Sequence, residues 1–132
     1  MQDIIVWTDI PATDLDRASK FYTHVLGMPV AQVPGIEGIA LPGTPPDEGA
    51  PPSGEMSVAF DLYTGGTPSM DGPTVYLSSL GDIDGMIARV KEAGGEILDE
   101  KAFMGPMIGW LAFFKDSEGN RIGIQQPGDG SE

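Results

Sequence analysis

The chain has 132 residues, with 20 acidic and 7 basic side chains, no cysteine and a formal net charge of −13 at pH 7. This length suffices for one domain with its own core, and the lack of cysteine excludes disulfides, thiolate metal sites and a cysteine nucleophile. The acidic excess opposes binding to nucleic acid or anionic lipid, and no apolar run is long enough to cross a membrane, so we expect a soluble, cytoplasmic protein.

A repeated order of predicted elements organises the chain. Residues 4–30 read as a strand, a capped amphipathic helix, a glycine and a second strand, and residues 74–98 repeat that order. Asp14 at the first helix start corresponds to Asp82 at the second. A repeat of this kind favours two half-domains packed in one fold, although two unrelated strand-helix-strand units would give the same local pattern.

The boundaries of the two half-domains follow from this repeat. We predict a single domain whose first half covers residues 3–63 and whose second half covers residues 73–127, followed by an acidic tail at 128–132. Residues 42–54 are rich in Pro and Gly, which predicts an irregular loop. Such a loop is either a surface insertion or a lid over a site.

In the first half, alternation divides the first strand between two faces. The expected core face carries Ile4, Val6, Thr8 and Ile10, and the opposite face carries Ile5, Trp7 and Asp9. Thr13 or Asp14 is expected to cap the following helix, and Gly27 to end it in the left-handed conformation. Further strands are predicted at 28–33, 38–41 and 55–62.

The second half begins with a predicted strand at 74–78. Val75 and Leu77 fall on its core face, and Thr74 and Tyr76 fall on the other. A helix with an apolar stripe follows and ends at Gly94 and Gly95. Three more strands are predicted at 96–99, 109–115 and 121–126, and a polar turn at 116–120 joins the last two.

This order predicts an α+β fold of two βαβββ half-domains, which form a curved eight-stranded mixed sheet with the helices on the outside. By alternation, the uncovered face of the sheet carries a mixed set of side chains: Trp7, Asp9, Thr74, Tyr76, Gly123 and Gln125. An apolar cleft with a few polar groups is typical of a small-molecule site. A satisfied polar core or a dimer contact would give the same alternation.

Two segments carry a resemblance to a known family. IPATDLDRASKFYTHVLGM at 10–28 and FFKDSEGNRIGI at 113–124 resemble the vicinal oxygen chelate superfamily, which includes glyoxalase I, bleomycin-resistance proteins and extradiol dioxygenases. The resemblance covers nearly the whole chain. It implies the fold described above and a homodimer, but one fold carries many chemistries.

The resemblance also implies four positions for metal ligands, two in each half and usually His or Glu. Three of them fall at Trp7, Thr74 and Gly123, and the fourth lies at an unassigned place within 55–62. Trp and Gly offer no suitable lone pair, and Thr is a poor ligand. His24, the only histidine, lies near the end of the first helix and cannot form a site alone. We therefore expect no metal cofactor, and neither metal-dependent isomerisation nor ring cleavage.

Three possibilities remain. The first is metal-free binding of a small, planar or cationic molecule in the cleft, where Trp7, Tyr76 and Trp110 provide stacking surface and Asp9 and Gln125 set the orientation. The second is a metal-independent isomerase or lyase that uses Asp9 as its base. A third possibility is a subunit whose open sheet pairs with a second copy. We expect a homodimer because sheet edges and apolar area need cover.

Overall fold

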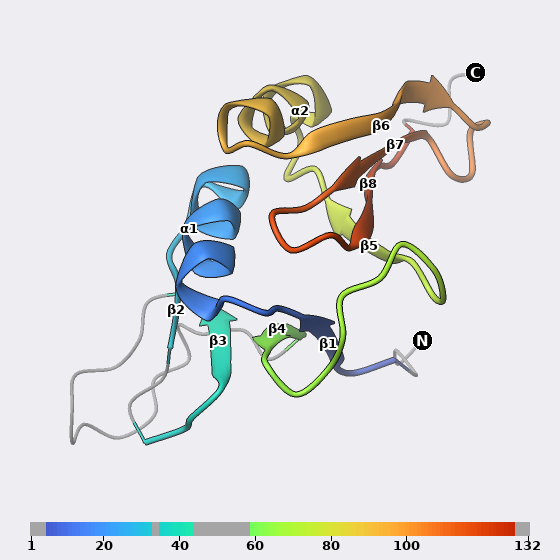
Figure 1. The fold of residues 1–132 in the computed structure, drawn as a ribbon. Coiled ribbons are helices and arrows are strands. Elements are labelled where there is room, and N and C mark those ends of the chain that lie inside the picture. Colours follow the sequence, from blue (N-terminus) through green and yellow to red (C-terminus); the bar gives the residue numbers. More distant parts are fainter. Residues whose placement is uncertain (1–4, 33–34, 44–58, 129–132) are drawn as a thin grey trace. The chain divides into compact units, whose positions relative to one another are not determined.

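The computed structural model describes residues 5–32, 35–43 and 59–128. The chain separates into two compact units, which we call unit one (Met1–Pro68) and unit two (Ser69–Glu132). In its described residues, each unit contains one helix and one four-stranded sheet (Figure 1). No helix in the described part of the chain is long and apolar enough to span a membrane.

Unit one contains the first five elements in βαβββ order: β1 (Thr8–Pro11), α1 (Leu15–Leu26), β2 (Val30–Gln32), β3 (Ile39–Pro42) and β4 (Phe60–Tyr63). Its sheet has the strand order β1-β4-β3-β2. The β1–β4 pair is parallel, and the other pairs are antiparallel. Helix α1 packs on β2, β3 and β4.

Unit two repeats this arrangement with β5 (Val75–Ser78), α2 (Ile83–Glu92), β6 (Glu96–Phe103), β7 (Trp110–Lys115) and β8 (Arg121–Gln126). Its strand order is β5-β8-β7-β6, again with one parallel pair, β5–β8. Helix α2 packs on β6, β7 and β8. The predicted pair of βαβββ units is confirmed, and its strands form two four-stranded mixed sheets.

Both helices begin at an aspartate cap. The Asp14 side chain accepts a hydrogen bond from the Arg17 N–H at 3.0 Å, and the Asp82 side chain accepts one from the Gly85 N–H at 2.9 Å. Such caps satisfy backbone donors that have no partner inside the helix. Gly27 ends α1 with a φ of 69°, in the left-handed conformation that favours glycine.

An apolar stripe on each helix packs against the sheet of its own unit. The buried residues of α1 are Ala18, Phe21, Tyr22, Val25 and Leu26, and those of α2 are Ile83, Met86, Ile87 and Val90. Burial of these side chains is the main favourable contribution to each unit, at roughly 1.5–3 kcal/mol for a large apolar side chain. The periodicity predicted both stripes.

Within the described residues, the largest differences from the predicted strand boundaries are in β1 and β6. Strand β1 begins only at Thr8, because its ladder starts with Thr8 opposite Phe60, and Ile5 and Val6 are 75% and 72% exposed. The prediction that Val6 belongs to the core face is therefore wrong. Strand β6 extends to Phe103, because Phe103 pairs with Trp110 of β7 after register shifts.

Some predicted features lie outside the described residues. These are Ile4, the first part of the predicted 55–62 strand, and residues 44–54 of the predicted loop. The predicted 116–120 turn is present: the Asp116 N–H donates to the Asn120 carbonyl at 2.9 Å, and one Asp116 carboxylate oxygen accepts from the N–H groups of Glu118 and Asn120.

Candidate functional site

In unit two, the face of the sheet opposite α2 carries a cluster of aromatic and polar side chains. We call it the unit-two face and define it by Thr74, Tyr76, Phe113, Arg121 and Gly123. Gly123 pairs with Tyr76 of β5 on one side and with Phe113 of β7 on the other, so these three residues form a row across the sheet. The alternate residues of β8 are the buried Ile122 and Ile124, as predicted.

The ring of Tyr76 packs directly over Gly123. A Cβ atom added at Gly123 would lie 2.5 Å from Cδ2 of Tyr76, which is closer than real contacts allow. The same ring meets Phe113 edge-on, with centroids 5.7 Å apart and an interplanar angle of 72°. Tyr76 is nevertheless 50% exposed, so one part of its ring is held by packing and another part faces outward.

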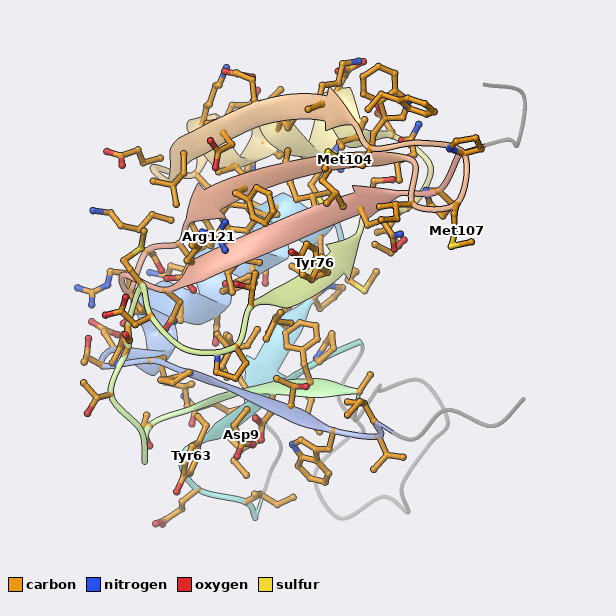
Figure 2. All side chains as sticks on the ribbon, turned by 90° about the vertical axis from the view of Figure 1, so that its right-hand side faces the viewer. Asp9, Tyr63, Tyr76, Met104, Met107 and Arg121 are labelled. Carbon is orange, nitrogen blue, oxygen red and sulfur yellow. The ribbon has the colours of Figure 1, made fainter. Side chains whose placement is uncertain are left out.

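Arg121 lies on this same face, next to Tyr76 (Figure 2). Its guanidinium carbon is 4.1 Å from the centroid of the Phe113 ring, and its Nη1 donates a hydrogen bond to Thr74 Oγ1 at 2.8 Å. The aromatic ring and the hydroxyl together fix the guanidinium plane. Among the described residues, Arg121 forms no ion pair with a carboxylate.

Of the other two predicted residues of this half, Gln125 lies on the predicted face and Trp110 does not. Gln125 lies on the same side of β8 as Gly123, and its amide donates to the Ile108 carbonyl at 3.0 Å. Trp110 pairs with Gln126 and so points to the side of the sheet that α2 covers. Its ring lies 5.3 Å from Phe103 and 5.0 Å from Lys101 Nζ. Trp110 and Tyr76 are therefore on opposite faces.

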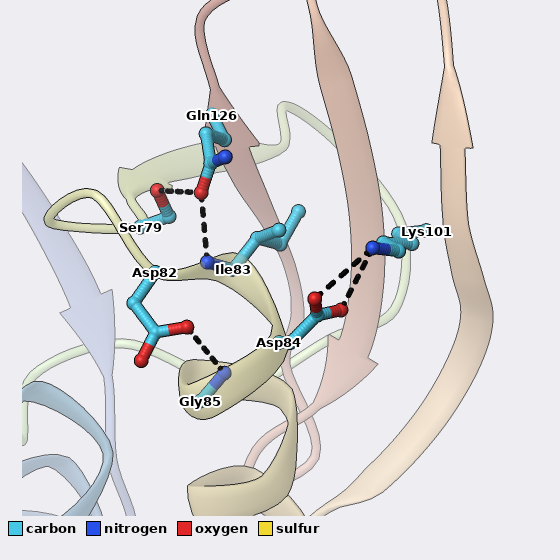
Figure 3. A network of polar contacts seen from close by, with 7 residues as sticks. All are labelled: Ser79, Asp82, Ile83, Asp84, Gly85, Lys101 and Gln126. Carbon is cyan, nitrogen blue, oxygen red and sulfur yellow. Dashed lines mark hydrogen bonds and ion pairs between the residues drawn. The ribbon is translucent and has the colours of Figure 1, made fainter.

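Lys101 links Trp110 to helix α2 rather than to the unit-two face. Its ammonium group forms an ion pair with Asp84 of α2 at 2.9 Å (Figure 3). The predicted grouping of Trp110 with the cleft aromatics thus does not form within this unit. The sequence could have shown this separation, because Trp110 and Phe113 are an odd number of positions apart on β7 and so point to opposite faces of the sheet.

In unit one, two carboxyl groups face each other on parallel neighbouring strands. Asp9 of β1 pairs in register with Asp61 of β4. The Trp7 indole Nε1 donates a hydrogen bond to Asp9 Oδ1 at 3.1 Å, and the Trp7 side chain is 49% exposed. The predicted association of Trp7 with Asp9 is present, and Asp61 joins it.

Asp61 is the residue that sequence reasoning missed. Its side chain is 0% exposed, and neither carboxyl oxygen has a hydrogen-bond partner in good geometry among the described residues. Burial, and then the neighbouring Asp9 carboxyl, raise the pKa of Asp61 from 3.8 to about 7, while the Trp7 indole acts in the opposite direction. The only signal in the sequence was an acidic residue between Phe60 and Leu62.

The two parallel ladders show which residues of the two units correspond. Asp9 and Asp61 form the second pair of the β1–β4 ladder, and Tyr76 and Gly123 form the second pair of the β5–β8 ladder. Asp61 therefore occupies in unit one the place that Gly123 occupies in unit two. This identifies Asp61 as the ligand position that the sequence left unassigned within 55–62.

The side chains at these four positions do not match the metal site implied by the resemblance. Trp7 presents an N–H donor, the Thr74 hydroxyl accepts a hydrogen bond from Arg121, and Tyr76 covers Gly123. Asp61 alone is a carboxylate, and a divalent metal needs several such donors. In the part of the chain that the structure describes, no group of three or more His, Cys, Asp or Glu side chains could hold a metal ion.

Comparison with known proteins agrees with this architecture. A glyoxylase-like domain-containing protein of Didymella fabae is 30% identical over 120 residues, which cover 88% of each protein. A glyoxalase/bleomycin resistance protein from Albidiferax ferrireducens T118 has the same fold, with a TM-score of 0.69, 20% identity, and coverage of 95% of this chain and 100% of that one.

TnmS3, an antibiotic binding protein from Streptomyces sp. CB03234, also has a similar fold, with a TM-score of 0.55, 24% identity, and coverage of 96% of this chain and 97% of that one. The family model for the glyoxalase/bleomycin resistance protein/dioxygenase superfamily matches residues 4–124. The duplicated βαβββ units, the matched span and the curated relative lead to one conclusion: the chain belongs to the glyoxalase/bleomycin resistance protein/dioxygenase superfamily.

Proposed function

We propose that this protein binds a small organic molecule without a metal, and that the unit-two face contacts the ligand. The observation that carries the proposal is the ring of Tyr76 over Gly123, at the position where the family resemblance implies a metal-binding carboxylate. This position therefore has no side chain that can bind a metal, and the Tyr76 ring above it provides a surface for stacking. Arg121, held by Phe113 and Thr74, adds a directional polar group beside it.

Two features support binding rather than plain packing. A half-exposed Tyr76 offers an apolar face with little loss of conformational entropy, because Tyr has only two side-chain torsions to fix. The neighbouring guanidinium is already oriented, so a ligand need not order it. TnmS3, which is named as an antibiotic binding protein, shares this fold, so ligand binding is one function that the fold carries.

Native mass spectrometry combined with metal analysis tests the proposal. Protein purified without chelators should carry a small organic molecule that dissociates on denaturation, and should contain far less than one transition metal ion per chain after dialysis. Tyr76→Ala should lose the organic molecule, whereas Tyr63→Ala, which removes a similar exposed aromatic side chain in unit one, should keep it. One tightly held zinc, nickel, iron or manganese ion per chain would overturn the proposal.

The carboxyl pair of unit one supports a second candidate function, a metal-independent isomerase or lyase. Because Asp61 holds its proton up to about pH 7, a protonated carboxyl group lies beside the Asp9 side chain near neutral pH. Asp9, predicted as the base, is exposed and would accept the proton from the substrate and return it, while the buried Asp61 would keep its own proton beside Asp9. A pair of this kind suits proton transfer next to a carbonyl group.

Deuterium exchange tests this second function. A small α-hydroxyketone such as dihydroxyacetone should exchange its carbon-bound hydrogen in D₂O in the presence of the protein, as followed by proton NMR. Asp9→Asn should abolish the exchange, and Asp61→Asn should remove its pH dependence near 7. Exchange at the rate of buffer alone, with wild-type protein at high concentration, would exclude acid–base chemistry on this probe.

We further propose that the protein forms a homodimer through the β6–β7 loop of unit two. Three apolar side chains of this loop are exposed, namely Met104, Met107 and Ile108, and Met107 is 94% exposed. Figure 2 labels the two methionines. Flexible Met side chains adapt well to a partner surface. Exposed apolar area of this kind on a small protein favours association with another protein surface.

A further inference from the structure

We propose that the unit-two face selects an anion, namely a small carboxylate with a planar apolar body, and that Arg121 binds the carboxylate group. This inference rests on the proposed function and narrows it to a class of ligand. It changes the sequence-based expectation of a planar or cationic ligand, because the polar group fixed on this face is a cation. Three observations support it.

The first observation is the way in which Arg121 is held. Its guanidinium lies 4.1 Å from the centre of the Phe113 ring, and one of its five N–H groups is used by Thr74 Oγ1 at 2.8 Å. The guanidinium fork matches two carboxylate oxygens, and a fork whose plane is already fixed loses little entropy on binding. Donors not used by Thr74 are therefore available to an anion.

The second observation concerns counter-ions. The chain has 20 acidic and 7 basic side chains, so most cations could find an internal partner. On unit two, Lys101 lies 2.9 Å from Asp84 and Lys91 lies 3.6 Å from Glu100. Arg121 and its cross-strand neighbour Lys115 are both half-buried, and neither has a carboxylate partner among the described residues. A half-buried cation without an internal counter-ion is the arrangement expected where a ligand supplies the negative charge.

The third observation is the position of Tyr76. Its ring lies over Gly123, and Gly123 and Arg121 are two residues apart on the same side of β8. Side chains at this spacing are separated by roughly 7 Å along the strand. A carboxylate on Arg121 would thus place an attached ring against the exposed part of Tyr76. This spacing fits a carboxyl group joined directly to a ring.

The net charge of −13 opposes an anion, but only at long range. At physiological ionic strength, charges further away than about 8 Å are largely screened. A carboxylate in contact with Arg121 interacts at about 3–4 Å, where the attraction is much less screened. We therefore expect the local cation to determine selectivity and the overall charge to slow association.

NMR titration of the full chain, labelled with nitrogen-15, tests the inference with three ligands of one shape. Benzoate is anionic, benzamide is neutral and benzamidine is cationic. We expect benzoate to bind most tightly and to shift the Gly123 and Tyr76 amide signals and the Arg121 side-chain Nε signal. Arg121→Met should weaken benzoate binding about tenfold or more, because a charged hydrogen-bonded contact is lost.

Two further variants keep the result interpretable. Lys91→Met removes the same charge from α2, outside the unit-two face, and should change benzoate affinity less than about twofold. Thr74→Val keeps the side-chain size but removes the hydroxyl that orients the guanidinium. Thr74→Val should weaken benzoate binding and leave benzamide binding unchanged. This variant therefore still tests the inference if Arg121→Met fails to fold.

Each outcome separates the inference from the proposed function. Benzamide or benzamidine binding at this face as tightly as benzoate would overturn the anion assignment and leave small-molecule binding intact. Equal effects of Arg121→Met and Lys91→Met would show attraction by overall charge only, which also overturns it. If none of the three ligands shifts the Tyr76 or Gly123 signals, the anion inference fails, and retention of an organic molecule in the native mass spectrum decides separately whether the proposed function stands.

Discussion

The two units carry different residues at equivalent positions of their parallel ladders. The parallel ladder of unit one pairs Asp9 with Asp61, and that of unit two pairs Tyr76 with Gly123. One pair consists of two carboxyl groups, of which one is buried, and the other of an aromatic ring over a glycine. The two functions proposed above, proton transfer in unit one and stacking in unit two, rest on this difference.

Burial of Asp61 predicts an unusual dependence of stability on pH. Its pKa is about 7 in the folded protein and close to 3.8 in the unfolded chain, so the folded state binds more protons between these values. The free energy of unfolding should therefore fall as pH rises from about 4 to 7, and the loss is complete above the folded pKa. A shift of about three units corresponds to a loss on the order of 4 kcal/mol.

Urea unfolding of wild type and Asp61→Asn between pH 5 and 8 measures this fall in the free energy of unfolding. The variant should lack the fall and should be more stable than wild type at pH 8, because it buries no charge and its amide can donate to Asp9. Asp71→Asn, which changes an exposed aspartate, serves as the control and should follow wild type. Parallel curves for wild type and Asp61→Asn would show that Asp61 does not hold a proton near neutrality.

The contact between Tyr76 and Gly123 makes a second prediction at the residue scale. Gly123→Glu restores the type of side chain implied by the family resemblance, but its Cβ would overlap the Tyr76 ring. We expect a destabilisation of about 1–3 kcal/mol from overpacking. In the Tyr76→Ala background the same change should cost much less. A double-mutant cycle from denaturant unfolding gives the coupling, and additive effects would mean that the ring does not restrict this position.

At the scale of elements, each helix start depends on residues outside the helix. Asp82, which precedes α2, caps the helix, and Gln126 at the end of β8 also contacts its first turn (Figure 3). The Gln126 Oε1 atom accepts hydrogen bonds from the Ile83 N–H at 2.8 Å and from the Ser79 hydroxyl at 3.1 Å. This side chain therefore joins the last strand of unit two to the first turn of its helix.

Gln126→Ala should therefore destabilise unit two by about 1–3 kcal/mol, because it leaves two donors without their partner and Ser79 is buried. Gln125→Ala is the matched control. The Gln125 amide makes a single hydrogen bond at an exposed site, so its loss in Gln125→Ala should destabilise the protein less. Denaturant unfolding measures both variants. A larger loss for Gln125→Ala would show that the connection between β8 and α2 contributes little.

At the scale of the whole molecule, the apolar residues of the β6–β7 loop determine the expected assembly. Met107 is almost fully exposed, so its replacement removes little packing from the single chain. Met107→Asp should therefore weaken dimerisation tenfold or more and leave the free energy of unfolding of the single chain nearly unchanged. Met70→Asp alters another exposed methionine of unit two and should leave the dimer intact.

Sedimentation velocity at low micromolar concentration tests this prediction. Wild type and Met70→Asp should sediment as dimers, and Met107→Asp should shift toward the monomer. A wild-type monomer at physiological salt contradicts the dimer. A dimer that Met107→Asp does not affect would place the interface elsewhere.

The sequence by itself determined the features that depend on local spacing. The period of the apolar residues, the capping aspartates Asp14 and Asp82, the left-handed Gly27 and the 116–120 turn all act over a few residues, so both helices and the repeat were predictable. Three of the four positions that correspond to metal ligands, Trp7, Thr74 and Gly123, also followed from the family resemblance.

Only the tertiary structure decided which side chains meet. The β1–β4 ladder brings Asp9 beside Asp61, and the β5–β8 and β7–β8 ladders set Tyr76 and Phe113 beside Gly123. Local sequence does not specify the register between distant strands, and a shift of one residue would turn every side chain to the other face. For the same reason, burial of Asp61 and its raised pKa could not be predicted, because both depend on neighbours that only the folded chain supplies.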